Sequence, residues 1–99
     1  MLANQEANVD RHIDADWLHM RQALGNRIRD LRIQKGWSQQ RLAADAGTRQ
    51  AKVSLLETGR IEPELGLVFR IARTFELSIT ELFPADGQSA RSPGRRRQR

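Results

Sequence analysis

The stretch that decides the fold is Gln39–Thr58, QQRLAADAGTRQAKVSLLET. Two helices that cross closely through a tight turn need a small residue at the crossing and a turn residue that tolerates a positive φ. Counted from Gln39, Ala43 stands fifth and Gly47 ninth, where these two needs arise. Val53 and Leu56 stand where apolar side chains would dock the second helix. The stretch therefore predicts two short helices joined by a tight turn.

The caps of these two helices can be read from the same region. Ser38 precedes the first helix and Thr48 the second, and both residue types favour the N-cap position. Gly47 and Gly59 follow the two helices, where a C-terminal glycine is expected. The inward-facing residues of the first helix are predicted to be Leu42, Ala43 and Ala46.

Apolar residues upstream recur every three or four positions, which places them on one stripe of a helix. The stripe consists of Trp17, Met20, Leu24, Ile28 and Leu31. Asp14 or Asp16 suits the N-cap of this helix, and Gly36 ends it. The spacing thus predicts a helix from about residue 16 to 35.

The segment downstream of Gly59 predicts two more helices. Pro63 suits the start of a helix. Ser78 to Glu81 has the S-x-x-E form of a capping box, and Pro84 ends the run. The inward stripe of the first of these helices is predicted to be Leu65, Val68, Ile71, Ala72 and Phe75. The fold class is therefore predicted as all-α, with a five-helix domain over residues 16–84 whose first helix is extended at its N-terminal end.

Length and composition limit the function classes. The chain has 99 residues, 38% of them hydrophobic, and no cysteine. One small domain with two solvated ends fits this length, whereas a two-domain enzyme does not. We expect residues 1–15 to form a flexible acidic extension and residues 85–99 a disordered Arg-rich tail. No membrane-spanning run is apparent in the sequence, so a cytoplasmic, nucleoid-associated location is expected.

The net charge of +5 is unevenly distributed. Residues 22–60 carry eight Lys or Arg against three Asp or Glu, and residues 85–99 carry five Arg against one Asp. Residues 1–21 and 61–84 both have an excess of acidic side chains. A basic half of a small domain is typical of a surface that binds a polyanion.

Residues 24–83 resemble the Cro/repressor-type helix-turn-helix family, also called the Xre family. The resemblance rests on short motifs along this whole range, with a weaker likeness to HipB-like antitoxins over residues 47–54 and 69–78. The shared motifs are Leu24-Gly25, Ile28-Arg29, Leu31-Arg32, Gly36-Trp37-Ser38-Gln39, Leu42-Ala43, Gly47, Leu56-Glu57-x-Gly59 and Ile71-Ala72. The resemblance implies a lambda-repressor-like domain whose third helix enters the major groove of DNA.

The resemblance also implies roles for individual residues. Gln39 would contact a DNA phosphate, and Arg32 would form an internal ion pair with Glu57. Ala51 would touch a thymine methyl group. Leu55 stands where other members often have a polar residue, so it either meets a thymine methyl group or packs elsewhere. The full set of implied DNA-binding residues is Gln39, Thr48, Arg49, Gln50, Ala51, Lys52, Ser54, Leu55 and Arg60.

The function that follows from these features is sequence-specific binding of a double-stranded DNA operator. We expect a transcriptional regulator, specifically a dimeric repressor of a short inverted repeat. The homodimer would be built partly from Leu67, Phe69 and the fifth helix, although these two side chains are equally suited to the core. The alternative is the antitoxin of a type II toxin–antitoxin module, which would bind a toxin protein and regulate its own operon. Controller proteins of restriction systems are a further possibility.

An enzyme is not expected. Both histidines lie within the first 19 residues, and there is no cysteine and no glycine-rich phosphate loop. His12, Asp16 and His19 are spaced along one side of a helix, but nothing else supports a metal site there. We therefore expect no catalytic residues, no metal and no cofactor.

Overall fold

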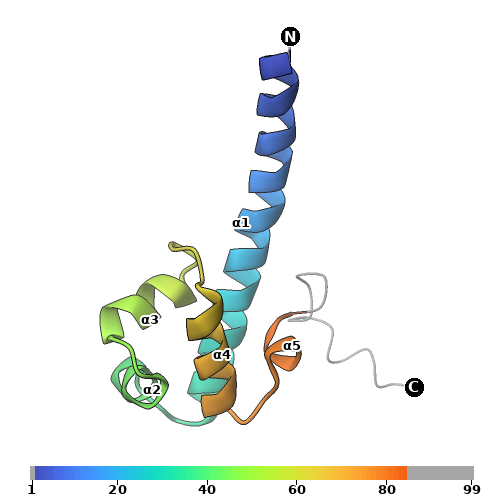
Figure 1. The fold of residues 1–99 in the computed structure, drawn as a ribbon. Helices are drawn as coiled ribbons and strands as arrows, with labels where there is room; N and C mark the ends of the chain where they lie inside the picture. The colour runs from blue at the N-terminus through green and yellow to red at the C-terminus, as the bar shows by residue number, and fades with distance from the viewer. Residues whose placement is uncertain (1, 85–99) are drawn as a thin grey trace, which may run out of the picture.

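The computed structural model describes residues 2–84, and side chains within residues 15–84. Five helices follow one another in this part of the chain, and it has no strand. They are α1 (Leu2–Gln34), α2 (Gln39–Ala46), α3 (Gln50–Glu57), α4 (Leu65–Thr74) and α5 (Ile79–Leu82). The lower part of α1 packs among the other four helices, and its N-terminal turns extend beyond them (Figure 1). The predicted fold class is confirmed. The predicted disordered tail, residues 85–99, lies outside the described residues.

Helix α1 begins earlier than the sequence analysis predicted. It runs from Leu2, so Asp14 and Asp16 lie inside the helix and the predicted N-cap is wrong. Residues 2–15 contain no glycine or proline, and such a segment can continue a helix that packing has already nucleated further along. The backbone is therefore helical from residue 2 onward, and the flexibility expected of residues 1–15 stays a prediction. The division between extension and domain at residue 16 stays a prediction.

The tight turn between α2 and α3 is formed as predicted. Gly47 has φ of 73°, and the amide N–H of Thr48 donates to the carbonyl oxygen of Ala43 at 2.9 Å. Because this bond holds Thr48 in the turn, Arg49 and not Thr48 is the N-cap of α3. Ser38 caps α2 as predicted, since its Oγ accepts a hydrogen bond from the Arg41 amide at 2.9 Å. The predicted capping box of α5 is present at Ser78 and Glu81.

The core lies where the lower half of α1, α2, α3, α4 and α5 meet. Its buried side chains come from the predicted stripes, except that in α4 Leu67 is buried in place of Leu65. Leu65 is 70% exposed at the first residue of α4, whereas Leu67 is 2% exposed. Leu67 therefore belongs to the core and cannot form the predicted dimer surface. The core residues are Leu24, Ile28, Leu42, Ala43, Ala46, Val53, Leu56, Leu67, Val68, Ile71, Ala72, Phe75 and Leu82.

Contacts between α1 and the loop after α3 fix the position of α3. The Arg21 Nη2 donates to the carbonyl oxygen of Gly59 at 3.0 Å. One turn earlier, the Trp17 indole N–H donates to a carboxylate oxygen of Glu62 at 3.2 Å. These bonds hold the α3–α4 loop beside α1, and this loop borders the outward side of α3. None of the helices described is both long and apolar enough to cross a membrane.

Candidate nucleic-acid interface

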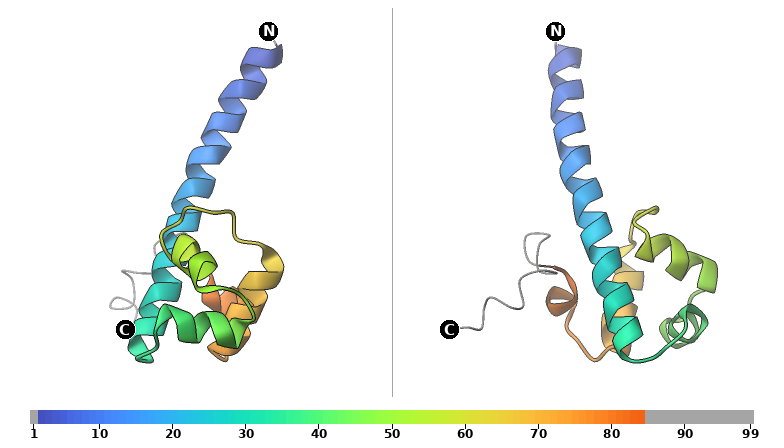
Figure 2. Two further views of the ribbon diagram at one scale, coloured as in Figure 1. Left: turned by 90° about the vertical axis from the view of Figure 1, so that its left-hand side faces the viewer. Right: turned by 180° about the vertical axis from the view of Figure 1, so that it is seen from behind.

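Helix α3 turns one side to the core and the other to solvent. Val53, Leu56 and Glu57 are buried. The opposite side carries residues that the sequence analysis assigned to DNA binding. In the left view of Figure 2, α2 and α3 lie toward the viewer, in front of α1. Arg49, Gln50, Ala51, Leu55 and Arg60 are exposed, and Gln39, Thr48, Lys52 and Ser54 are half-buried. The structure thus brings the predicted residues to one face, while their roles stay predictions.

A buried carboxylate anchors this face. Glu57 is 3% exposed and lies 2.7 Å from Arg32, measured from Oε2 to Nε. A second bond joins Arg32 Nη2 to Glu57 Oε1 at 3.0 Å. Arg32 also donates from Nη1 to the carbonyl oxygen of Trp37 at 2.8 Å. The expected ion pair is therefore formed, and it ties the C-terminal end of α1 to α3 and to the segment that leads into α2.

The environment of Arg32 keeps it charged. Its hydrogen bonds to Glu57, and to a lesser degree the negative charge of that carboxylate, raise the pKa of Arg32, although burial acts in the opposite direction. A raised pKa in the folded state stabilises the fold at every pH below the pKa of the unfolded chain. The contribution of the Arg32 charge to stability is consequently lost as the pH rises into strong alkali.

Two glutamines extend the buried pair to the surface. The Gln39 amide nitrogen donates to Glu57 Oε1 at 3.0 Å, and the Gln39 amide oxygen accepts from the Gln50 amide nitrogen at 2.7 Å. Gln39 is the first residue of α2 and Gln50 the first residue of α3. A continuous chain of hydrogen bonds thus runs from Arg32 in α1 to the exposed end of Gln50. The ion pair of Arg32 with Glu57 was expected, but the two bonds of Gln39 were not, because they join residues 18 and 11 positions apart.

Several cations border the face. Arg49, Lys52 and Arg60 belong to the predicted set, and none of them is in a salt bridge among the described residues. Arg41 differs, because its Nε lies 3.0 Å from Asp45 Oδ2 and its guanidinium lies 4.7 Å from the centre of the Trp37 ring. The net result is a basic edge around α3, as the uneven charge of the sequence indicated.

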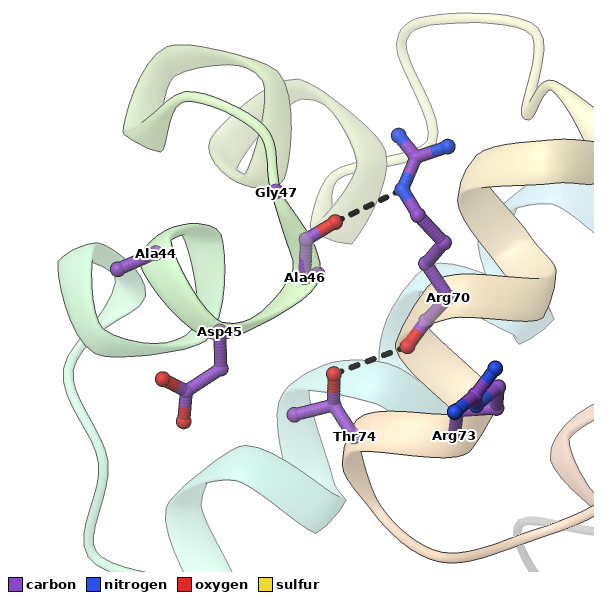
Figure 3. A pocket seen from close by; sticks show the side chains of 7 residues that line it. All are labelled: Ala44, Asp45, Ala46, Gly47, Arg70, Arg73 and Thr74. Atoms are coloured by element: carbon purple, nitrogen blue, oxygen red, sulfur yellow. Dashed lines mark hydrogen bonds between the residues drawn. The ribbon is translucent and has the colours of Figure 1, made fainter.

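A hollow lies between α2 and α4, with a volume of about 440 Å³ (Figure 3). Arg70 donates from Nε to the carbonyl oxygen of Ala46 at 2.9 Å, and Thr74 donates to the carbonyl oxygen of Arg70 at 2.9 Å. A cation at the C-terminal end of a helix satisfies carbonyl groups that have no partner within the helix. Arg70 therefore fastens α4 to the end of α2, a role that no local signal in the sequence indicates.

The sequence of residues 28–82 identifies the family. A family model described as Helix-turn-helix, HTH_3, matches residues 28–82, which is more than half of the chain. The chain belongs to the Xre-type helix-turn-helix family. This family consists of DNA-binding regulators and not of enzymes, so the prediction that the protein is a transcriptional regulator is confirmed.

Relatives of this Xre-type protein include an HTH-type transcriptional regulator and an antitoxin. It is 39% identical to an uncharacterized HTH-type transcriptional regulator of Archaeoglobus fulgidus, over 63% of this chain and 89% of the relative. It is 37% identical to the antitoxin HipB of Escherichia coli O6:H1, over 58% of this chain and 61% of the relative. The match to HipB thus leaves more than a third of that antitoxin without a counterpart.

Solved structures show the same fold. The restriction-modification controller protein C.AhdI from Aeromonas hydrophila superposes with a TM-score of 0.61 at 32% identity, over 63% of this chain and 94% of that protein. The clp gene regulator ClgR from C. glutamicum superposes with a TM-score of 0.64 at 25% identity, over 73% of this chain and 92% of that protein. Both comparisons support the Xre-type assignment.

Proposed function

We propose that the protein binds a double-stranded DNA operator in a sequence-specific manner, as a dimeric repressor of a short inverted repeat. The observation that supports this most strongly is the outward face of α3, where exposed polar and cationic side chains stand beside the Gln39–Gln50 hydrogen bond. We place this activity in the cytoplasm, on the nucleoid.

The side chains on this face suit the edges of base pairs. A glutamine amide can pair with N6 and N7 of adenine, and Arg or Lys can pair with O6 and N7 of guanine. Gln50 is held at its amide nitrogen by Gln39, which limits its rotamers before DNA arrives. Arg49 and Lys52 supply the cations at the same helix end. We therefore assign base contacts to Gln50, Arg49 and Lys52, and phosphate contacts to Gln39 and Arg60.

Gln50→Ala is expected to weaken binding to the preferred operator by about 5- to 150-fold, because one bidentate base contact contributes about 1 to 3 kcal/mol of discrimination. Affinity for random DNA should stay unchanged. Arg60→Ala should weaken the affinities for operator and for random DNA to the same extent. It should also reduce the slope of log affinity against log salt concentration by about 1, as expected for a lost phosphate contact. Fluorescence anisotropy with operator and random duplexes at several salt concentrations measures both effects.

Gln34→Ala is the matched control for these two variants, because Gln34 is an exposed glutamine at the end of α1. It should bind both duplexes like the unmodified protein. The assignment of Gln50 to base contact would be wrong if Gln50→Ala lost equal affinity for operator and random DNA.

The dimer would use the exposed side of α4. Leu65 is 70% exposed and Phe69, one turn later, is 48% exposed. Together they place two large apolar side chains in solvent, where they suit a two-fold contact between copies. Phe83, the residue that follows α5, is half-buried. In the proposed dimer contact, Leu65 thus replaces Leu67, which was predicted from the sequence.

Phe69→Glu is expected to convert a dimer to a monomer, because a two-fold contact would bring two like charges together at an apolar surface. Sedimentation velocity gives the mass, and circular dichroism shows whether the fold is retained. Ile33→Glu, at an exposed apolar residue of α1, serves as control and should leave the mass unchanged. A monomeric parent protein, or a dimeric Phe69→Glu variant, would exclude this surface.

A second candidate function is that of an antitoxin, and the similarity to HipB favours it. The protein would then bind a toxin and regulate its own operon. Affinity purification from native lysate, with and without nuclease, distinguishes the two. A stoichiometric protein partner that survives nuclease would support the antitoxin. Recovery of one enriched promoter fragment without a protein partner would support a repressor that acts alone.

A further inference from the structure

Helix α3 has an apolar hollow on its outward side. The hollow has a volume of about 300 Å³ and is lined by Arg49, Ala51, Lys52, Leu55 and Ile61. Ala51 and Leu55 are separated by one helical turn, so their side chains lie on the same side of α3. Ile61 comes from the loop that follows the helix. The floor of the hollow is therefore apolar, while its edge carries two cations.

The side chain of Leu55 does not belong to the hydrophobic core. Its side chain is 38% exposed, whereas Val53 and Leu56 beside it are at most 2% exposed and fill the core. Ile61 packs partly against the core and leaves its remaining surface toward the hollow. An apolar hollow among polar residues of a DNA-facing helix is open to a small apolar group of the DNA itself.

The major groove offers one such group. The C5-methyl group of thymine is the apolar feature among the hydrogen-bond donors and acceptors of the base edges. Cytosine has only a hydrogen at the same carbon, and 5-methylcytosine carries a methyl group there. A hollow that accepts the methyl group of thymine would consequently accept that of 5-methylcytosine.

We infer that Ala51, Leu55 and Ile61 form a receptor for the C5-methyl group of a pyrimidine, so that the protein distinguishes methylated from unmethylated cytosine at one position of each half-site. This inference rests on the proposed function and adds a form of regulation to it. Arg49 and Lys52 stand beside the hollow, where they can reach the guanine or the phosphate next to that pyrimidine. Methylation of a cytosine in the operator would then strengthen binding without any change of sequence.

The test uses the full chain and an operator selected from random duplexes. Each thymine of one half-site is replaced in turn by deoxyuridine, which removes the methyl group alone, and each cytosine by 5-methylcytosine. The thymine in the hollow should show an increase of about fourfold in Kd on replacement, the effect of one buried methyl group. With cytosine in that place, 5-methylation should lower Kd by about the same factor.

Leu55→Ala shows whether the hollow is responsible. This variant should bring the ratio of the Kd values for the deoxyuridine and thymine duplexes at that position to about 1, because the apolar contact with the methyl group is removed. Ile33→Ala, at an exposed apolar residue of α1, is the matched control and should keep the whole methyl effect.

The outcomes separate the two proposals. If no operator can be selected, the proposed function fails. If an operator is selected but neither deoxyuridine nor 5-methylcytosine alters Kd at any position, only the methyl receptor is excluded. A methyl effect that Leu55→Ala leaves intact would likewise overturn the assignment to this hollow.

Discussion

Replacing Glu57 by alanine is expected to lower the free energy of unfolding by about 3 to 5 kcal/mol, the usual cost of removing one partner of a buried ion pair. The carboxylate is 3% exposed and accepts bonds from Arg32 Nε, Arg32 Nη2 and the Gln39 amide. Its loss leaves a largely buried guanidinium without its counter-charge. Chemical denaturation followed by circular dichroism measures the change.

The double variant Arg32→Met with Glu57→Leu separates stability from DNA binding. Removing both charges avoids an uncompensated buried cation, so much of the lost stability should return. Operator binding should nevertheless stay weak, because Gln39 no longer has the acceptor that holds it beside Gln50. If Glu57→Ala lowered the free energy of unfolding by less than about 1 kcal/mol, the buried ion pair would not make the large contribution to stability that is expected of it. Full operator affinity in the double variant would show that the glutamine chain does not position Gln50.

The parts of the fold that were predicted correctly depend on short spacings. Gly47 needs a positive φ because the chain reverses there within two residues, and Ser38 caps α2 because its Oγ reaches a backbone amide three residues on. Val53 and Leu56 lie on the buried side of a helix whose start the turn has already fixed. Such features are set by residues within one helical turn of each other, so the sequence alone displays them.

Features that depend on distant contacts were not predictable in this way. Leu65 and Leu67 are both apolar and near the start of α4, and only the packing of α2 and α5 against α4 decides which one is buried. No motif or spacing in the sequence indicates that Arg70 donates to the carbonyl oxygen of Ala46 at the end of α2. The start of α1 at Leu2 was missed because periodicity detects helices by a buried stripe, whereas propensity alone can extend them.

The same distinction between local and distant features applies to the candidate site. The resemblance to the Xre family indicated which residues share the outward face of α3, since their positions follow from the helix alone. The hydrogen bonds among Gln39, Gln50 and Glu57 join three different places in the sequence. Ile61 completes the apolar hollow from a loop whose course no motif specifies. Local sequence therefore predicts the members of the face but not the contacts that orient them.

Gly25 lies inside α1, where a glycine usually weakens a helix, and the structure gives it a specific role. A Cβ at this position would overlap the carbonyl oxygen of Leu56 and stand 2.7 Å from the carbonyl oxygen of Glu57. These carbonyls are backbone atoms at the end of α3, so they cannot move without shifting the helix. The missing side chain is therefore what allows α1 to approach α3 closely.

Gly25→Ala is expected to lower the free energy of unfolding by about 2 kcal/mol, because the cost of overpacking exceeds the gain of about 1 kcal/mol in helix propensity. Operator affinity should fall as well, since the shift acts on Leu56 and Glu57 in α3. Gly66→Ala, in α4, is the matched control: its Cβ would meet only Arg70 Nη1, at an ordinary 3.7 Å. That variant should be as stable as the parent or slightly more so. Thermal unfolding compares the two, and a Gly25→Ala protein as stable as Gly66→Ala would show that α1 and α3 can separate at no cost.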